Sequence, residues 1–512
     1  MDDVKGLSER ICSIGATFLE WPPDVFGFCA YLAKVTGIYT IYARSPEKTL
    51  GIRAEAVDLG SRWRKGINAN PKTIPRDIRR AWRSVCGLRG TLLSELQEND
   101  DFVRSVLLLI ASADEACAGV GLPSPDGPDG FEFFSEVILG IHGNLCRLVP
   151  ADTIRVLPKL HTPQSGLNIR SLSHHLALCS GSEVKATWAQ SALLQNYERK
   201  SVNILLAPWP LSIGASAFVP AKIKSQNGDY FGYVDFKPTV VGGDGAVATW
   251  LRKKLRQVSQ LGQKVDVVVF PECSLNEMEW GKVSAICQKE KVVGISGVRS
   301  AGVNSRSLNS VRIRVPQMHG EFLQYKHHRW QLNEAQIRAY NLGGTLATDI
   351  LWWENIEIRD REVHFLAVDP DLTIAMLICE DLARQDPVAE LVRAVGPNLV
   401  VALLMDGPQL NDRWASRYAS VLAEDPGCSV LTLSSLGMVE RSTPAGASVQ
   451  RVVASWRDAI NGFAEIRLPS TSDAAVLNIQ FKMKREWTID GRSDGEVASY
   501  PVLCGSHFLR GD

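Results

Sequence analysis

The spacing of apolar residues along the chain changes near residue 200. Upstream of this point the spacing is helical: residues 21–37 open with prolines and close at a glycine, and residues 98–121 open at a capping residue and close at a glycine. Prolines and glycines crowd residues 122–130, where they exclude helix and strand and predict an internal hinge. Residues 1–195 are therefore predicted to form a mainly helical region.

Downstream of residue 200, short apolar segments alternate with amphipathic helices. Many of the short segments are unbroken runs of Val, Ile and Leu, which indicates strands that are buried on both faces. Examples are VDVVVFPE (265–272), LTIAMLICED (372–381) and NLVVALLMD (398–406). Residues 247–262 and 411–425 carry apolar side chains at helical spacing instead. Strands covered by helices predict a layered α/β domain over residues 200–512.

The charges of the chain cancel, with 56 Lys and Arg residues against 56 Asp and Glu residues. We therefore expect no global field that would attract nucleic acid or an anionic membrane. The first residues, MDDVKGLSER, lack the apolar stretch of a secretory signal, and the longest apolar runs are too short to span a bilayer. These features favour a cytoplasmic protein without a membrane partner.

Eleven cysteines are scattered along the sequence, and none of them forms a CxxC pair. An odd, unpatterned set of thiols is typical of a reducing compartment, where most cysteines serve as small core residues. His161, His174, His175 and Cys179 lie within one stretch, but their spacing fits no standard zinc motif. No metal site is therefore predicted.

Three strand-like segments end on reactive side chains. VVVFPE ends on Glu272, EFLQYK ends on Lys326 and AMLIC ends on Cys379. A thiol, a base that removes its proton and a fixed cation that lowers its pKa and stabilises an oxyanion together suit the attack on an amide or nitrile carbon. A single cysteine that closes an apolar run is usually a packed core residue. The predicted active site therefore requires that the three strand ends lie together in the fold.

These segments resemble the nitrilase, or carbon–nitrogen hydrolase, superfamily. The chain has FPE at 270–272, YK at 325–326 and ICED at 378–381, which is the order found in that superfamily. His328 matches the K-x-H that often follows the lysine, and Glu334 lies eight residues beyond Lys326, where a second glutamate is common. GAS at 446–448 is similar to a further motif of the superfamily. The resemblance covers about residues 202–490 and leaves residues 1–195 unassigned.

The resemblance implies a role for each matching residue. Cys379 would be the nucleophile, Glu272 the general base and acid, and Lys326 the group that stabilises the intermediate. Glu334 would position the lysine or the substrate, although a solvated carboxylate at a helix start is the alternative interpretation of this residue.

The superfamily also implies a set of groups around the reacting carbon. The backbone N–H of Glu380 would complete an oxyanion site, and Asp381, His328 and Met405 are predicted to lie at the oxyanion site or pocket. The implied fold is an α-β-β-α sandwich that assembles into dimers or larger oligomers, with no metal or organic cofactor.

Three departures from the superfamily pattern affect the pocket. Cys273 follows the proposed base directly, ARQDP follows the CEDL run, and residues 230–238 resemble an insertion after the first strand. These features bear on the substrate more than on the chemistry.

Two functions of different classes follow from these observations. The first is a thiol hydrolase that cleaves a small-molecule amide, carbamoyl or nitrile substrate through a thioester on Cys379. The second is a nitrilase-like effector or ligand-binding module of a bacterial defence or signalling assembly, with little or triggered turnover. In both, residues 1–195 would serve as a partner-binding, sensor or oligomerisation region.

Overall fold

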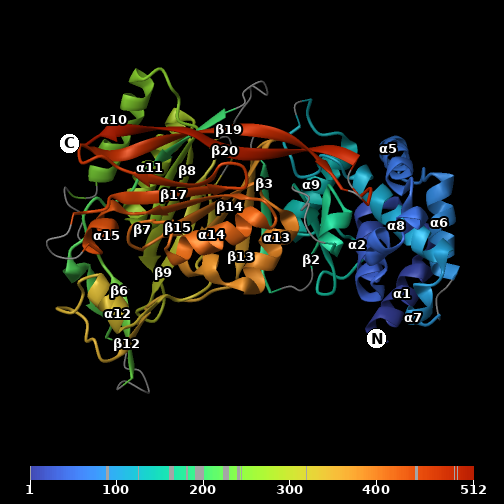
Figure 1. Cartoon of the computed structure of the whole chain (residues 1–512), viewed down its shortest axis with the longest axis horizontal. Helices are drawn as coiled ribbons and strands as arrows, with labels where there is room; N and C mark the ends of the chain where they lie inside the picture. Colours follow the sequence, from blue (N-terminus) through green and yellow to red (C-terminus); the bar gives the residue numbers. More distant parts are fainter. Residues whose placement is uncertain are drawn as a thin grey trace.

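The structure, a computed structural model, has a helical region at one end and stacked sheets at the other (Figure 1). It describes residues 2–511 except 88–90, 125, 161–166, 180–182, 191–200, 223–229, 239–242, 244, 317, 319, 444–447, 489 and 493. The fold class predicted from the sequence, an α/β sandwich preceded by a mainly helical region, is confirmed.

The N-terminal region consists of helices, three of which (α2, α5 and α6) pack against the buried helix α8. Its helices are α1 (Asp2–Ile14), α2 (Pro22–Thr36), α3 (Ile41–Arg44), α4 (Pro46–Thr49), α5 (Ile52–Ala69), α6 (Arg76–Gly87), α7 (Leu93–Leu96), α8 (Asp100–Ala116) and α9 (Gly130–His142). The prediction for 21–37 is confirmed, because α2 has prolines in its first turn and ends at Gly37, whose φ is 72°. The cap of α8 is Asn99, whose side chain accepts a hydrogen bond from Phe102 N at 2.9 Å.

The proline- and glycine-rich segment 122–130 forms neither helix nor strand in its described part before Gly130, where α9 begins. Its end is anchored, because Asp129 and Glu132 form a reciprocal capping box at the start of α9. Arg64 of α5 also pairs with Asp129 at 2.8 Å. The C-terminal side of the predicted hinge is therefore tied to the helices that precede it.

Two seven-stranded sheets form the larger part of the molecule. The first has the order β10-β9-β8-β7-β4-β19-β20 and the second has the order β18-β17-β16-β15-β14-β13-β3. The strands of the first sheet are β4 (Ser201–Leu206), β7 (Val267–Asn276), β8 (Val293–Ala301), β9 (Ser307–Arg314), β10 (Phe322–Tyr325), β19 (Ser472–Trp487) and β20 (Asp494–Arg510). Those of the second are β3 (Lys185–Gln190), β13 (Glu362–Asp369), β14 (Leu372–Ile378), β15 (Leu399–Leu404), β16 (Ser429–Ser434), β17 (Val452–Asp458) and β18 (Gly462–Arg467).

The two sheets pack face to face, and helices cover their outer faces. β7 shows why its sequence does not alternate: Val267 and Val269 belong to the core between the sheets, whereas Val268 and Phe270 pack against α10 (Ala246–Gln260) and α11 (Glu277–Glu290). On the other side, α14 (Trp414–Glu424) packs on β16 and β17, and α13 (Glu390–Val395) precedes β15. This is the α-β-β-α layering that the resemblance implies.

The predicted domain boundary near residue 195 requires a correction. β3, which lies upstream of it, pairs in parallel with β13 from Lys185–Glu362 to Gln190–Ala367 and forms the edge of the second sheet. The sandwich therefore draws one strand from the region predicted to be separate from it. A two-stranded sheet of β1 (Arg155–Pro158) and β2 (Leu176–Cys179) lies between this strand and the helices in sequence.

A long C-terminal hairpin joins the sandwich to the helical region (Figure 1). The first half of β19 pairs with β4, from Ala475–Leu206 to Gln480–Ser201, while its second half continues with β20 alone. Near the turn of the hairpin, the ring Nε2 of His174 hydrogen-bonds the carbonyl oxygen of Arg492 at 3.0 Å. The turn of the hairpin therefore contacts the segment between β1 and β2.

A four-stranded sheet caps one end of the sandwich. Its strands, in the order β11-β12-β6-β5, are β11 (Gln331–Leu332), β12 (Leu351–Glu354), β6 (Phe231–Phe236) and β5 (Phe218–Pro220). The short helices α12 (Glu334–Ala339) and α15 (Leu436–Arg441) complete the elements. The segment 230–238, which the sequence suggested as an insertion, thus provides a central strand of this small sheet.

Within the described residues, no single helix has both the length and the apolarity that a membrane span requires. Length and composition would allow only the pair formed by α2 and Ile38–Arg44, which is bent by 82°.

Candidate active site

Glu272 lies in an irregular stretch of β7, where the pairing with β8 shifts between Phe270 and Leu275. The bulge turns the carboxylate into the interior, where it is fully buried. Its Oε1 accepts hydrogen bonds from Lys326 Nζ at 2.7 Å and from Asn309 Nδ2 at 2.8 Å. Its Oε2 has no hydrogen-bond partner among the described residues, so this oxygen is available to accept a proton.

Lys326 follows β10 and is held between two carboxylates. Its Nζ donates to Glu272 Oε1 and to Glu354 Oε2, both at 2.7 Å, and its backbone N–H donates to Asn309 O at 2.9 Å. Burial by itself disfavours the ammonium, but the charges of Glu272 and Glu354 outweigh it and raise the Lys326 pKa well above its usual value. Lys326 is therefore a permanently charged group inside the protein.

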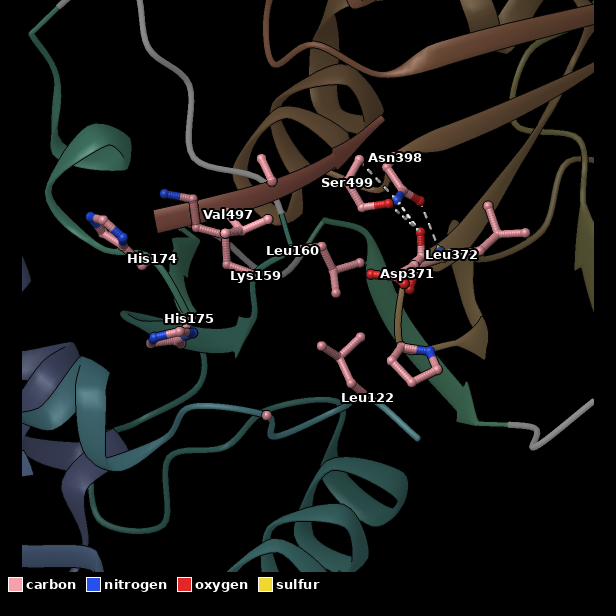
Figure 2. Close-up of a pocket in the computed structure, with 14 residues that line it drawn as sticks. Leu122, Lys159, Leu160, His174, His175, Asp371, Leu372, Asn398, Val497 and Ser499 are labelled. Carbon is pink, nitrogen blue, oxygen red and sulfur yellow. Dashed lines mark hydrogen bonds between the residues drawn. The ribbon is translucent and has the colours of Figure 1, made fainter. Parts of the chain in front are cut away.

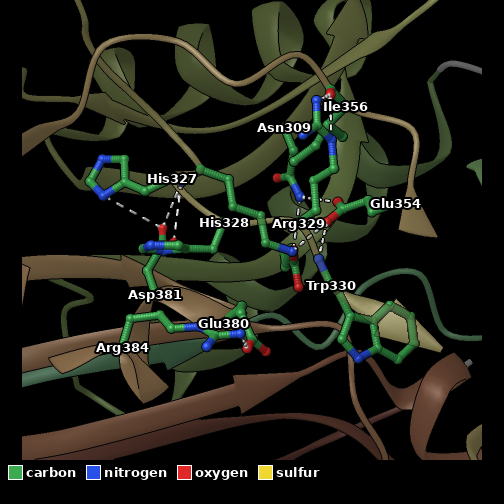
Figure 3. Close-up of polar contacts among 12 residues, drawn as sticks. Asn309, His327, His328, Arg329, Trp330, Glu354, Ile356, Glu380, Asp381 and Arg384 are labelled. Carbon is green, nitrogen blue, oxygen red and sulfur yellow. Dashed lines mark hydrogen bonds and ion pairs between the residues drawn. The ribbon is translucent and has the colours of Figure 1, made fainter. Parts of the chain in front are cut away.

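Glu354 and Asn309 complete this buried network (Figure 3). Asn309 Nδ2 also donates to Glu354 Oε1 at 2.8 Å, so one amide bridges both carboxylates. Trp330 N donates to Glu354 Oε2 at 3.2 Å. Two carboxylates share one lysine, and burial together with the Glu354 charge raises the pKa of Glu272.

Cys379 stands at the end of β14, an interior strand of the second sheet, and begins a short 3₁₀ turn that ends at Ala383. Its φ of 47° is left-handed, a conformation that a non-glycine residue adopts at a cost of about 1–3 kcal/mol. Such strain at a strand end is typical of a side chain that must point in one direction. The residue is 3% exposed.

The Cys379 thiol lies within the electrostatic reach of the buried charges. Burial raises its pKa well above the usual value, the charge of Glu272 adds to this effect, and the charge of Lys326 opposes it. Lys326 lowers the thiol pKa as predicted from the sequence, but burial and the charge of Glu272 outweigh this effect, so the net shift of the pKa is upward. Cys379 therefore rests as a neutral thiol, which needs a base before it can act as a nucleophile.

The strands next to Cys379 bring further polar groups to the same end of the sheet. β14, β15 and β16 are parallel, so their carboxyl ends meet. Asp406, just after β15, accepts hydrogen bonds from Trp414 Nε1 at 2.8 Å and from Arg413 Nη2 at 2.5 Å, and it also contacts the hydroxyl of Tyr340. The charge of Asp406 also acts on the Cys379 thiol.

Gln324 fixes the two sheets against each other near the site. Its Nε2 donates to Met376 O of β14 at 2.9 Å, and its Oε1 accepts from His364 N of β13 at 3.0 Å. Lys326 follows two residues later, so this buried amide sets the distance between the lysine-bearing strand and the cysteine-bearing strand.

The structure separates Glu334 from the other predicted site residues. Its side chain is 58% exposed at the start of α12 and pairs with Arg338 at 2.6 Å. The carboxylate that positions Lys326 is Glu354, so the role predicted for Glu334 is corrected. Glu334 fits the alternative interpretation, a solvated carboxylate at a helix start.

The remaining predicted residues surround the Cys379 turn. Asp381 is buried and accepts hydrogen bonds from His327 N at 3.1 Å and from His328 Nδ1 at 2.9 Å, which ties the segment after Lys326 to the segment after Cys379 (Figure 3). Glu380 pairs with Arg384. Met405 is buried directly after β15. Asp381 and Glu380 therefore fix the turn, and the oxyanion role of the Glu380 N–H stays a prediction.

Two other features of the sequence, Cys273 and the GAS motif, also bear on the resemblance to the superfamily. Cys273 is buried beside Glu272 with a φ of 51°, and its carbonyl oxygen accepts a hydrogen bond from Arg299 Nη1 at 2.7 Å. Most of the GAS motif, residues 446 and 447, lies outside the described residues.

Two clusters of side chains could in principle bind a metal ion. Asp114, Glu115 and His175 form one, but Asp114 accepts hydrogen bonds from three successive backbone N–H groups, those of residues 174–176, and Arg53 pairs with Glu115. Glu272, Cys273 and Glu354 form the other, and the Lys326 ammonium already lies between its carboxylates. In both clusters a resident cation occupies the place of a metal. His161 of the predicted His/Cys stretch lies outside the described residues.

Two cavities lie near the features described so far. One, of about 460 Å³, is bordered by the segments that follow Lys326 and Cys379. The other, of about 230 Å³, lies at the junction with the helical region and is lined by Lys159, His174, His175 and Asp371 among others (Figure 2). Burial lowers the pKa of Lys159 to about 7. This second cavity touches the start of β14, the end opposite to Cys379.

No family model and no curated protein matches the sequence. Solved structures of nitrilase-superfamily proteins match about 55% of the chain. Nit3 of Saccharomyces cerevisiae, a member of branch 10 of that superfamily, is 13% identical, with 55% of this chain and 89% of that chain covered and a TM-score of 0.34.

Two further solved structures match at a similar level. The amidase from Nesterenkonia sp. is 9% identical, with 55% and 91% covered and a TM-score of 0.34. The glutamine-dependent NAD+ synthetase from Acinetobacter baumannii is 12% identical, with 58% and 47% covered and a TM-score of 0.34. At these values we draw no conclusion about activity from the likeness.

Sequence reasoning missed Glu354, Asn309 and Asp406. Glu354 ends the run LWWE and Asp406 follows the run VALLM, so both carry the signal that identified Glu272, a carboxylate at a strand end. Asn309 had a weaker signal, as an amide inside a strand whose neighbours are buried. Nothing in the sequence around these three residues indicates that they lie in the same site as Lys326.

Proposed function

We propose that this protein is a carbon–nitrogen hydrolase with Cys379 as its nucleophile. The observation that supports this most is the buried Glu272–Lys326–Glu354 network, whose charges act on a thiol held at a strained strand end. A buried ion network placed only for stability has no need of an adjacent thiol or of an unpartnered carboxylate oxygen.

In the proposed reaction, Glu272 Oε2 takes the proton from Cys379 Sγ as the sulfur attacks the amide carbon. The Lys326 ammonium and the Glu380 N–H stabilise the oxyanion of the tetrahedral intermediate. When the C–N bond breaks, Glu272 returns the proton to the leaving nitrogen, and ammonia or an amine departs, leaving a thioester. Water then attacks the thioester with Glu272 again as base, which releases the acid and restores the thiol.

Glu354 has a separate role in this proposal. It keeps Lys326 fixed and charged while Glu272 changes its protonation state, because one carboxylate always remains beside the ammonium. Asn309 holds both carboxylates in place through one amide.

One observation favours the second candidate, a ligand-binding or triggered module. Cys379 is 3% exposed and lines neither of the two cavities described above. A movement of the surrounding segments would then have to precede attack on a substrate.

Mass spectrometry after incubation with a panel of amides and nitriles, followed by acid quench, tests the leading proposal. We expect an acyl adduct on Cys379 and ammonia release that Cys379→Ala lowers by about a thousandfold or more. Cys504→Ala is the background control because Cys504 is exposed and lies outside the network, and its rate should equal that of the wild type. Ammonia release that survives Cys379→Ala would exclude the proposed mechanism. A chain that forms no adduct and releases no ammonia, yet binds a ligand, would favour the second candidate.

A further inference from the structure

The larger cavity, of about 460 Å³, has an unusual lining. Three aromatic side chains, Phe231, Tyr233 and Trp353, form one wall, and His328, Arg329 and Arg384 lie around them. The volume is that of a pocket for a small organic ligand. We call this cavity the aromatic pocket.

The aromatic wall is one face of the four-stranded sheet. β12 pairs with β6 in parallel, with Trp353 opposite Tyr233 and Leu351 opposite Phe231. Residues two apart on a strand point to the same side, so the three rings share a face. Their neighbours Trp352 and Val234 point to the other side, where they are buried in the core. The ring-bearing face is only partly buried, although each of these side chains is large and apolar.

Two guanidinium groups near this wall, those of Arg329 and Arg306, have no carboxylate hydrogen-bond partner within the described residues. Arg329 donates from Nη2 to the carbonyl oxygen of Ile356 at 2.9 Å, and within the described residues it has no carboxylate partner. Arg306 lies 6.0 Å from the centre of the Tyr233 ring. Burial and the charge of Arg306 lower the pKa of Arg329, so these two guanidinium groups repel each other.

The other two polar groups of the pocket are held by the turn that follows Cys379. His328 is oriented by Asp381 through its Nδ1, which leaves Nε2 without a partner in the described part of the chain. Arg384 is paired with Glu380. Arg329 is therefore the lining guanidinium that has no carboxylate hydrogen-bond partner within the described residues, and the charge of nearby Arg306 acts on it.

We propose that the aromatic pocket binds a planar aromatic ligand that carries an anionic group, with a nucleoside monophosphate as the representative of this class. The ring stacks on the wall formed by Tyr233 and Trp353, and the phosphate or carboxylate lies beside Arg329. Every base has a flat π-face that stacks on aromatic side chains, and an anion relieves the repulsion between the two guanidinium groups.

This inference does not depend on hydrolysis, because it concerns binding alone. It goes beyond the proposed function by assigning a ligand class to a pocket that Cys379 does not line. The pocket is nevertheless next to the candidate active site, since Arg329 follows Lys326 by three residues and Trp353 precedes Glu354.

Isothermal titration of the full chain carrying Cys379→Ala tests the proposal without turnover. The probes are AMP and UMP, together with adenosine, inorganic phosphate and 4-hydroxybenzoate. We expect AMP or UMP to bind at least about tenfold more tightly than adenosine or phosphate, because both the ring and the anion contribute. Tighter binding of 4-hydroxybenzoate than of either nucleotide would support the proposed ligand class and show that the anionic group of the ligand is a carboxylate instead of a phosphate. Failure of every probe to bind at millimolar concentration, or equal binding of AMP and adenosine, would overturn the proposal.

Variants locate the binding in the aromatic pocket. Trp353→Ala and Tyr233→Ala should each weaken AMP binding by roughly tenfold or more, and Trp353→Phe and Tyr233→Phe should restore most of it because they keep a ring. Arg329→Gln should remove the preference for AMP over adenosine. Trp487→Ala and Arg338→Gln are matched controls on exposed residues outside the pocket, and both should bind like the parent chain. Unchanged AMP binding in Trp353→Ala and Tyr233→Ala, with melting temperatures like that of the parent, would contradict the assignment.

Discussion

At the scale of single residues, the candidate site depends on one ammonium shared by two buried carboxylates. Without Lys326 and Asn309 between them, the buried carboxylates of Glu272 and Glu354 would repel each other. The arrangement keeps Lys326 charged and makes Glu272 a stronger base than an exposed glutamate. It also leaves the Cys379 thiol neutral until a proton is removed.

The pH dependence of hydrolysis should reveal the coupling between the two carboxylates. Glu272 must be ionised to act as a base, and its pKa is raised, so kcat/KM should fall as the pH drops through that raised value. Glu354→Gln removes a charge that raises the Glu272 pKa, and the acid limb of the profile should therefore move to lower pH. The measurement is ammonia release across pH with the best amide of the panel.

Glu334→Gln is the matched control for this experiment. It makes the same chemical change at an exposed carboxylate, and its pH profile should coincide with that of the wild type. An acid limb that moves to higher pH in Glu354→Gln, or that moves equally in Glu334→Gln, would contradict the coupling.

The sequence predicted Glu272, Lys326 and Cys379 because each closes an apolar run, which is a local signal. Glu354 and Asn309 were missed because they reach the site from β12 and β9, and sequence does not reveal which strands become neighbours. Glu334 was misassigned for a related reason: its spacing from Lys326 matched the superfamily, but the chain turns outward into α12 there.

At the scale of elements, the bulge in β7 is what turns Glu272 inward. The neighbouring strand β8 accommodates this bulge with Gly297, where a Cβ would lie 2.5 Å from Glu272 Cα and 2.7 Å from Cys273 N. The close approach of two backbones therefore requires glycine at this position.

Gly297→Ala should displace the bulge, destabilise the protein by about 1–3 kcal/mol and lower the hydrolysis rate by about tenfold or more. Calorimetry and ammonia release measure the two effects. Gly281→Ala in α11 is the control, because a Cβ there meets no atom within 4 Å. It should leave activity unchanged and raise stability by about 0.5–1 kcal/mol. A Gly297→Ala protein with wild-type stability and rate would contradict the role of the bulge.

Helices and buried strands were the elements that the sequence predicted well. Both ends of α2 and the start of α8 carry capping signals that act within a few residues, and the strands of the sandwich have unbroken apolar runs. The end of α8 was predicted less well, because the helix stops at Ala116 with Cys117 as its cap and does not reach the predicted glycine. The aromatic face of β6 was described as an insertion, because β12, its neighbour on one side, comes from more than a hundred residues further along the chain.

At the scale of the whole molecule, the helical region and the sandwich are joined by two elements. β3 enters the second sheet from upstream, and the β19–β20 hairpin extends from the first sheet to His174. The predicted boundary at 195 failed at β3 because a parallel pairing with β13 is non-local and leaves no signal in the short segment itself.

The importance of β3 can be measured with two shortened chains. A chain that begins at residue 201 lacks β3 and uncovers the edge of β13, whereas one that begins at residue 183 keeps it. We expect the shorter chain to aggregate more, because an open strand edge pairs with other molecules. Size-exclusion chromatography gives the monodisperse fraction of each. Both chains lack α1 to α9 and differ in β3. An equal monodisperse fraction for the two chains would therefore show that β3 does not protect the sheet from aggregation.

The position of β19 has a consequence for the order in which the protein can fold during synthesis. The neighbour of β4 in the sheet, β19, lies more than 260 residues further on, and Asn203 meets Asn478 only in the finished sheet. A nascent chain thus carries an unpaired edge on β4 until residues 475–480 have been made. A product that ends before residue 475 would leave that edge open and should be a ready substrate for chaperones and proteases.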